Sequence, residues 1–271
     1  MNAQPFPIRF KLTHPGDQSL QTKLEWFLHQ PGIILAAVEP LQGGTVSELH
    51  ISRKGVILLS GEERLRFHPS MALLRLMNLE RGQADRFLGA TGLTPGDALL
   101  DATLGLGTDA LVAAFAVGPQ GSVVGIEQAA ILAALVKDGL ATLGARHDVV
   151  GVSAAKAKAW VGLFEAAPRI QVCWEEHGEF LKNLGDQTFD VVYFDPMFRR
   201  TRTKSASIRP LHAYAEHGEL TRATIAAACR VARKRVVLKE RKGSREFARL
   251  GFEVVESGRY SQVDYGVIEL D

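Results

Sequence analysis

Short apolar runs alternate with longer segments of helical periodicity from about residue 69 onward. The strand-like runs are "DALLDAT", "SVVGIEQ", "RIQVCWEE", "FDVVYFDP" and "KRVVLKER". The segments between them, such as "TDALVAAFAVG" and "AAILAALVKDGLATLG", have the length and spacing of helices. Because the strand-like runs are apolar on both faces, the pattern predicts an α/β fold with a parallel sheet covered by helices on each side.

The end of the chain departs from this alternation. Two strand-like runs, "FEVVES" at 252–257 and "DYGVIEL" at 264–270, are joined by only a short link. Parallel strands need a long crossover connection, so we expect these two strands to pair antiparallel at the edge of the sheet.

The pattern of apolar residues is different in residues 1–67, where strand-like runs are separated by turn signals. The runs are "GIILAAVEP", "ELHISRKGVILLSG" and "ERLRFHP". The dipeptide "KG" at 54–55 lies between two apolar runs and predicts a hairpin turn. We therefore expect a small N-terminal α/β or mainly β region at 1–67 and a larger domain at 68–271.

The composition is that of a soluble globular protein. The 271 residues are 46% hydrophobic and 23% charged. No stretch reaches the roughly 18 uninterrupted apolar residues of a membrane span, and no apolar run of the signal-peptide type opens the sequence. Cys173 and Cys229 lie far apart without metal-ligand spacing, which favours buried thiols in a reducing compartment. We expect a cytoplasmic protein without a metal site.

Positive charge is concentrated in one segment. Between Arg199 and Arg245 the sequence has fourteen Lys or Arg residues against three acidic residues, so this segment is +11 and the remainder −9. Such a concentration suits a polyanion, because each neutralised phosphate releases condensed counterions. The alternative is a set of solvated helix faces. The run Arg199, Arg200, Arg202 and Lys204 directly follows a predicted strand, and we expect it to bind phosphates.

The segment "LLDATLGLGTDALVAA" at 99–114 predicts a strand, a glycine-rich turn and a helix. Gly105 and Gly107 allow the backbone to pass close to a ligand, and Thr108 or Asp109 is placed to cap the helix. Ligands of such sheets bind beyond the carboxyl ends of the strands. A dinucleotide-binding turn would require a glycine where this sequence has Ala110.

Carboxylates stand at the ends of the predicted strands. Asp101 occupies the place of a dinucleotide pyrophosphate, and its charge suits an ammonium group instead, which favours S-adenosylmethionine (SAM) over a nicotinamide cofactor. Glu127 follows the glycine turn by about 20 residues, the spacing of a carboxylate that accepts from both ribose hydroxyls. Glu176 is a candidate acceptor for the adenine amino group, with Glu175 as the alternative.

The fourth predicted strand, Asp190–Phe194, runs directly into "DPMF". It delivers Asp195 to the same edge of the sheet, and Pro196 has no N–H while its carbonyl still accepts. This carboxylate and a neighbouring carbonyl can accept the two hydrogens of one exocyclic amine, and the Phe198 ring offers a stacking face for a base. Methyl transfer requires such positioning and a dry site more than a strong base. The alternative is a purely structural Asp-Pro cap.

Together these motifs resemble the class I SAM-dependent methyltransferases over about residues 68–271. The D-x-x-x-G-x-G turn from Asp101 to Gly107, which includes Thr103, is similar to the cofactor loop of that family. The stretch from Asp195 to Phe198 resembles the Asp/Asn-Pro-Pro-aromatic motif of amino-methyltransferases that act on nucleic-acid bases, with Met197 in place of the second proline. The resemblance implies SAM as cofactor and a Rossmann-like sheet of seven strands, the last antiparallel. The residues expected to bind SAM are Asp101, Thr103, Gly105, Gly107, Thr108, Asp109, Glu127, Glu176 and Asp195.

A narrower resemblance rests on "DATLGLGTDA", "AALVKDGL", "VVYFDPMF" and "RVVLKE". These segments look like the ribosomal small subunit methyltransferase J family and its Gram-positive relatives, which modify the exocyclic N2 of a guanine in 16S ribosomal RNA. The resemblance implies an RNA methyltransferase whose partner is small-subunit ribosomal RNA or its assembling particle.

Three further residues are candidates for contacts to the substrate. His68 and Ser70, in "FHPSMALLR" at 67–75, stand at a predicted helix start, where they could line the cofactor or base pocket or serve only as a structural cap. Lys239 ends the fifth strand at the same sheet edge, where it could contact a phosphate or a base, or be an exposed lysine of the basic segment.

The first functional hypothesis is therefore a SAM-dependent RNA methyltransferase that modifies an exocyclic amine, most specifically guanine N2. A DNA or RNA adenine-N6 methyltransferase is the second, and Met197 is discordant with it. A third is a non-catalytic RNA-binding protein that keeps the fold, although a pure binder needs neither the cofactor turn nor the Asp-Pro motif. A nicotinamide-dependent oxidoreductase is the fourth.

Overall fold

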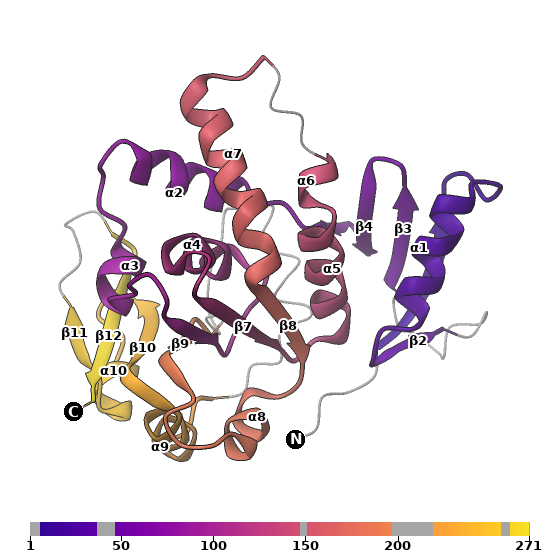
Figure 1. Cartoon of the computed structure of the whole chain (residues 1–271). Helices are drawn as coiled ribbons and strands as arrows, with labels where there is room; N and C mark the ends of the chain where they lie inside the picture. Colours follow the sequence, from indigo (N-terminus) through magenta and orange to yellow (C-terminus); the bar gives the residue numbers. More distant parts are fainter. Residues whose placement is uncertain (1–5, 37–46, 147–150, 197–218, 256–260, 271) are drawn as a thin grey trace.

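Two β-sheets and the helices that cover them make up the described part of the chain (Figure 1). The computed structural model describes residues 6–36, 47–146, 151–196, 219–255 and 261–270. No helix within these ranges is both long enough and apolar enough to cross a membrane.

The larger sheet has seven strands in the order β11-β12-β10-β9-β6-β7-β8. The strands are β6 (Ala98–Asp101), β7 (Ser122–Glu127), β8 (Ile170–Trp174), β9 (Phe189–Phe194), β10 (Ala232–Arg241), β11 (Glu253–Val255) and β12 (Val263–Glu269). Neighbouring strands are parallel except around β12, which runs antiparallel to β10 and to β11. The predicted α/β sheet with an antiparallel last strand is confirmed.

Alternating side chains explain why this sheet is buried on both faces. In β9, Val191 and Tyr193 belong to one core cluster and Val192 and Phe194 to another, and all four are 0% exposed. Successive residues of a strand point to opposite faces, so a strand with four consecutive buried residues requires cover on both sides.

Helices provide that cover. In Figure 1, α2, α4 and α7 lie above the larger sheet, and α8 and α9 lie below it. The first face is covered by α2 (Ser70–Glu80), α3 (Arg86–Thr91), α4 (Thr108–Val117), α6 (Leu143–Arg146), α7 (Ala154–Ala166) and the short η1 (Ala167–Arg169). The second face is covered by α8 (His177–Asn183), α9 (Arg222–Val231) and α10 (Glu246–Leu250).

The smaller sheet has five strands in the order β2-β1-β3-β4-β5. Its elements are β1 (Phe6–Leu12), α1 (Gln18–Leu28), β2 (Ile33–Leu35), β3 (Ser47–Ser52), β4 (Gly55–Ser60) and β5 (Glu63–Leu65). The hairpin expected at 54–55 is confirmed, with Ser52 paired to Gly55. Two elements, β1 and α1, were not predicted. β1 is a central strand that pairs parallel with both β2 and β3.

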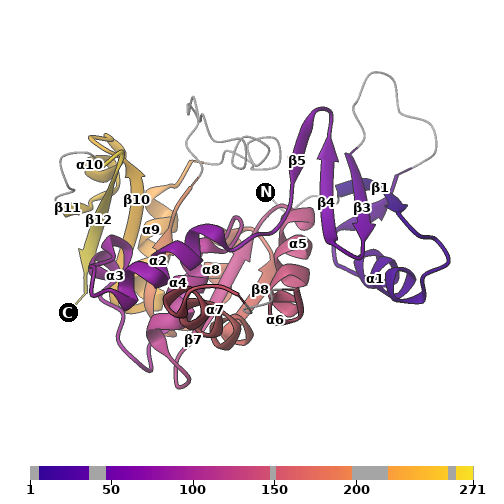
Figure 2. The same ribbon diagram turned by 90° about the horizontal axis from the view of Figure 1, so that it is seen from above.

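The smaller sheet packs on helix α5 (Ala130–Ala141), which Figure 2 shows between this sheet and β8. Leu49 of β3 shares a buried cluster with Ile131 and Leu135 of the helix. Lys23 of α1 forms an ion pair with Asp138, also on α5. The two sheets are therefore joined through an apolar helix face, and the division of the chain at residue 67 remains a prediction.

Candidate active site

The carboxyl ends of β9, β6 and β7 lie side by side because these strands are neighbours in the larger sheet. Asp101 ends β6, where it is in register with Tyr193 of β9 and Gly125 of β7. Glu127 ends β7, and Asp195 directly follows β9. The structure thus brings to one edge three of the carboxylates that were predicted to stand at strand ends.

The turn between β6 and α4 runs across the ends of the neighbouring strands. The Ala102 N–H donates to the Tyr193 carbonyl at 2.9 Å, and the Leu104 N–H donates to the Ile126 carbonyl at 2.9 Å. The turn is therefore hydrogen-bonded to β9 on one side and to β7 on the other, which fixes its position over the sheet edge.

Gly105 and Gly107 both have the left-handed backbone conformation, with φ of 54° and 73°, which favours glycine. A Cβ on Gly105 would meet no described atom within 4 Å apart from its own chain neighbours, so the turn borders open space there. Helix α4 begins at Thr108 with Gly107 as its N-cap, and no side chain caps it. The prediction that Thr108 or Asp109 caps this helix is therefore wrong, because the left-handed glycine makes the turn.

Thr103 joins the glycine turn to the strand end that carries Asp195. Its hydroxyl oxygen accepts the Asp195 N–H at 2.5 Å, and its own N–H donates to the Asp101 carboxylate at 3.1 Å. The loops that follow β6 and β9 are thus hydrogen-bonded to each other. This contact places the Asp195 backbone directly beside the turn.

Asp101 is 1% exposed. Burial raises the pKa of its carboxyl well above the usual range, and repulsion from Asp109 adds to the effect. One carboxylate oxygen accepts the Thr103 N–H, while the other has no hydrogen-bond partner among the described residues. A cationic ligand group would favour the ionised form of this carboxyl, so Asp101 is suited to receive one.

Glu127 links the glycine turn to the start of α5. Its two carboxylate oxygens accept the Gly105 N–H at 3.0 Å and the Ala129 N–H at 2.8 Å. Burial raises the pKa of the Glu127 carboxyl to about 7. This side chain therefore changes its charge near neutral pH.

Asp109 and Lys239 form a buried group of charges next to Asp195. The Lys239 Nζ lies 2.6 Å from the Asp195 carboxylate and 3.1 Å from that of Asp109. Asp109 also accepts the Tyr193 hydroxyl at 2.8 Å and binds the Arg75 guanidinium. Protein donors bind both carboxylate oxygens of Asp109, and the Lys239 ammonium lies between two carboxylates, so Lys239 is not the exposed lysine of the alternative interpretation. Contacts of Asp109 with the cofactor and of Lys239 with a phosphate or base remain predictions.

Arg75 and Tyr193 are members of this site that sequence reasoning missed. The Arg75 guanidinium also donates two hydrogen bonds to the Asp85 carboxylate, with N···O distances of 2.7 and 2.8 Å. It lies on α2 between the buried Leu73 and Leu76. A single arginine on an apolar helix face, like a tyrosine within an apolar strand, signals a buried polar partner, because such groups are rarely left unpaired.

His68 and Ser70 lie at a helix start, as predicted. Ser70 is the first residue of α2 and is exposed, whereas the His68 Nδ1 is buried without a hydrogen-bond partner in the described structure. Burial and the nearby Arg66 lower the pKa of His68, so its ring is neutral at neutral pH. The role of both residues in a ligand pocket remains a prediction.

The two carboxylates that follow β8 have different surroundings. Glu176 is the N-cap of α8, and its side chain accepts the N–H groups of Gly178 at 3.0 Å and Glu179 at 2.9 Å. The Glu175 side chain has no hydrogen-bond partner in the part of the chain that the structure describes. Glu175, the alternative for the adenine contact, is therefore the freer acceptor of the two.

Five of the predicted substrate contacts lie outside the described residues. They are Phe198, Arg199, Arg200, Arg202 and Lys204. Pro196, which follows Asp195, is described and is half-buried. The geometry of the site therefore rests on the strand ends and the glycine turn.

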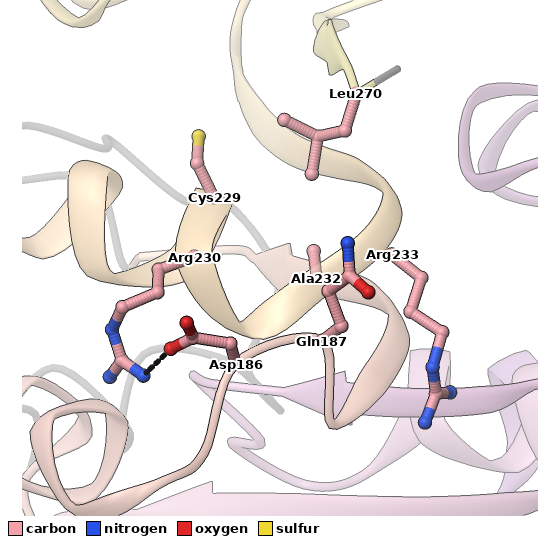
Figure 3. A pocket seen from close by; sticks show the side chains of 7 residues that line it. All are labelled: Asp186, Gln187, Cys229, Arg230, Ala232, Arg233 and Leu270. Atoms are coloured by element: carbon pink, nitrogen blue, oxygen red, sulfur yellow. Dashed lines mark hydrogen bonds and ion pairs between the residues drawn. The ribbon is translucent and has the colours of Figure 1, made fainter.

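A hollow of about 450 Å³ lies at the opposite edge of the larger sheet, near the amino ends of β9 and β10 (Figure 3). Asp186, Arg230 and Arg233 are among the residues that line it. The Arg230 guanidinium is held by Asp186 at 2.7 Å and by the Leu184 carbonyl at 2.7 Å. No predicted site residue lines this hollow, so we place the active site at the carboxyl edge.

Two comparisons of sequence show what this chain is similar to. Residues 68–264 match the family model described as "Putative SAM-dependent methyltransferase". The chain is also 39% identical over 236 residues to the uncharacterized protein YpiP of Bacillus subtilis (strain 168), which covers 83% of this chain and 86% of that protein.

A comparison of structures extends the similarity to the fold. A SAM-dependent methyltransferase from Neisseria gonorrhoeae, NGO1261, superposes with a TM-score of 0.63 and 19% identity, over 97% of this chain and 95% of that chain. The family match of residues 68–264 spans the glycine turn, Asp101, Glu127 and Asp195. This chain therefore belongs to the SAM-dependent methyltransferase family.

Proposed function

We propose that this SAM-dependent methyltransferase modifies an exocyclic amine of a base in RNA, and that its target is guanine N2 in small-subunit ribosomal RNA. The proposal is carried by the contact between Asp195 and Thr103, which sets an amine acceptor beside the glycine turn. The guanine and the ribosomal RNA come from the resemblance of the Asp-Pro-Met-Phe segment and its companions to the methyltransferase J family.

The residues at the glycine turn fit SAM. Asp101 has a carboxylate oxygen without a partner among the described residues, which suits the ammonium group. The open space at Gly105 lets a ligand approach the backbone closely. Glu127 stands where ribose hydroxyls are bound in sheets of this type, and Glu175 or Glu176 would accept from the adenine amino group.

Asp195 and Pro196 are placed to orient the substrate amine. SAM, when bound, supplies a sulfonium methyl group: the C–N bond forms as the C–S bond breaks, the sulfur keeps that electron pair, and one N–H proton is lost to solvent. The Asp195 Oδ2 is bound to Lys239, whereas Oδ1 and the Pro196 carbonyl have no partner among the described residues. Two adjacent acceptors hold an amine in one orientation, which is how positioning accelerates such a reaction.

Positive charge on the smaller sheet supports an RNA substrate. Ile8 and Leu65 are buried, so the residues that flank them along β1 and β5 point to the opposite face. The basic side chains of that face are Arg9, Lys11 and Arg64, and Arg66 directly follows β5. Strand β5 ends at Leu65 and α2, the helix that carries Arg75, begins at Ser70, so a short link joins this sheet to a helix of the active site. Contacts of this kind bind the phosphate backbone without reading its sequence.

Methyl transfer to RNA from cells that lack the gene tests the proposal. The full-length protein is incubated with isotope-labelled SAM and with small-subunit ribosomal RNA, both free and in the assembled particle. We expect the label in N2-methylguanosine when the RNA is digested to nucleosides and analysed by mass spectrometry. Label in N6-methyladenosine would overturn the choice of base. SAM binding without labelled RNA would overturn the choice of substrate.

The affinity for SAM is expected to rise with pH through neutrality. The pKa of Glu127 is about 7 without the cofactor, and hydrogen bonds from ribose hydroxyls favour the ionised form, so binding releases a proton below that pH. We expect a Kd about tenfold larger at pH 6 than at pH 8 by calorimetry. Kd is measured against pH for the wild type and for Glu127→Gln. Any titration of SAM itself affects both proteins equally, so the difference between the two profiles reports Glu127 alone. Identical profiles would contradict the prediction.

A further inference from the structure

We infer that Lys239 is a positioning residue for Asp195: it holds one oxygen of the carboxylate and leaves the other for the substrate amine. The inference rests on the function proposed above. Its starting point is that Lys239 lies in the strongly basic segment 199–245, yet the structure buries its ammonium group between carboxylates at the active site.

The geometry identifies Lys239 as a bridge between two loops of the site. It lies near the carboxyl end of β10, and its side chain is only 21% exposed. Its Nζ is 2.6 Å from the Asp195 Oδ2 and 3.1 Å from the Asp109 Oδ2. A charged hydrogen bond of 2.6 Å is a short and strong one. It fixes the direction in which the Asp195 carboxylate points.

Asp109 is itself held, so Lys239 is not free to turn away. The Tyr193 hydroxyl donates to the same Asp109 oxygen at 2.8 Å, and Arg75 binds the other oxygen. Arg75 is in turn held by a two-pronged contact with Asp85. These hydrogen bonds and ion pairs connect four elements near the carboxyl edge of the sheet: α2, α4, β9 and β10.

Charge gives Lys239 a second effect on Asp195. The ionisable groups that face this pair are Asp101 of β6, Asp109 of α4, Arg75 of α2, Tyr193 of β9, Tyr265 of β12 and Glu240 of β10. Burial and Asp109 raise the pKa of Asp195, whereas Lys239 lowers it. Without Lys239, Asp195 would bind a proton more readily, and a protonated carboxyl donates where the amine requires an acceptor.

Lys239 itself is suited to hold and not to transfer a proton. The two neighbouring carboxylates raise the pKa of its ammonium group above the usual range, against the effect of burial. It therefore stays cationic at neutral pH. A cation already satisfied by two carboxylates also has little to offer an RNA phosphate.

Lys239→Met tests the inference by separating kcat from KM. We expect kcat to fall about 10²-fold, the effect of a small misplacement of a reacting group. The Kd for SAM and the KM for RNA should stay within a few-fold of wild type. The acid limb of the kcat profile should move to higher pH, because Asp195 is then ionised only in more alkaline solution. Lys239→Arg, which keeps the charge, should retain the wild-type limb and more of the rate.

Lys234→Met is a matched control on the same strand. Lys234 also bridges two aspartates, Asp97 at 2.5 Å and Asp190 at 3.6 Å, but at the opposite edge of the sheet. This variant also loses an ion pair with two aspartates, but the Lys234 side chain is 44% exposed against 21% for Lys239. It should therefore lower stability by a smaller amount and leave both kcat and the acid limb unchanged. A Lys239→Met enzyme with a raised KM for RNA, an unchanged kcat and a weaker salt dependence of binding would overturn the inference in favour of a phosphate contact.

A second measurement is independent of any substrate. Carbon-13 labelling of aspartate carboxyls allows NMR to follow the titration of Asp195 in the cofactor-free protein. We expect the pKa of Asp195 to be higher in Lys239→Met than in wild type, and unchanged in Lys234→Met. An unaltered titration would refute the role of Lys239 even if RNA is methylated. If the pKa of Asp195 rises in Lys239→Met as expected but the RNA is not methylated, the proposed substrate is refuted and the role of Lys239 is retained. Lys239→Arg serves for both measurements if the methionine variant does not fold.

Discussion

Replacing Asp195 by Asn is expected to lower kcat for methyl transfer by about 10³-fold while the Kd for SAM changes by no more than a few-fold. The amide keeps the shape of the side chain but loses the negative charge and one acceptor. Lys239 then lacks a counter-ion at 2.6 Å, and the substrate amine meets a weaker or a misdirected partner. Rapid-quench measurement of a single turnover beside calorimetric titration of SAM separates the two steps.

Asp190→Asn is the control for that experiment. Asp190 lies on β9, the strand that Asp195 follows, and its carboxylate accepts the Ala98 N–H at 2.9 Å at the amino edge of the sheet. We expect this variant to lose some stability and to keep its kcat. Asp195→Ala is the less informative change, because it removes the shape of the side chain and both of its acceptors together with the charge. A large loss of SAM affinity in Asp195→Asn would show that Asp195 acts on the cofactor.

The carboxylates at the strand ends were predictable because a parallel sheet leaves little choice. The carboxyl ends of neighbouring parallel strands meet at one edge, so Asp101, Glu127 and Asp195 had to converge once the strands were recognised. The glycine turn was predictable for a similar reason. A left-handed backbone is uncommon for other residues, and Gly105 and Gly107 mark where it occurs.

The partners of the charged groups were not predictable in the same way. Asp109 and Lys239 are separated by 130 positions in the chain, and nothing in their local sequence shows that one binds the other. Glu176 illustrates the opposite case. Its position before Gly178 suits a helix cap as well as a ligand contact, and the structure uses it as a cap.

The first two elements were missed for reasons of topology and of weak periodicity. Strand β1 is paired parallel to β2 and β3, so its neighbours lie well beyond any local window. Helix α1 has few buried side chains, among them Leu20 and Phe27. A local signal was nonetheless present, because the Asp17 carboxylate accepts the Ser19 N–H at 3.0 Å as an N-cap.

Glu127→Ala is expected to weaken SAM binding by about 10²-fold or more. Hydrogen bonds to a charged group contribute about 1.5–3 kcal/mol each, and the proposed contact has two, one to each ribose hydroxyl. The change also removes the acceptor for the Gly105 N–H, so the glycine turn loses a support on the cofactor side. Kd is measured by calorimetry, and thermal unfolding without SAM reports how far the turn itself is disturbed.

Glu127→Gln separates the loss of the ribose contacts from the loss of support for the glycine turn. Glutamine keeps one carbonyl acceptor for the turn or for a hydroxyl, so its loss of affinity should be intermediate. Because Glu127 lies at the end of β7 while Asp195 follows β9, kcat at saturating SAM should remain within a few-fold of wild type in both variants. A collapse of kcat with an unchanged Kd would move Glu127 from cofactor binding to the reacting amine. It would also contradict the proposed arrangement, in which residues at the carboxyl ends of β6 and β7 bind SAM and residues at the carboxyl ends of β9 and β10 bind the substrate.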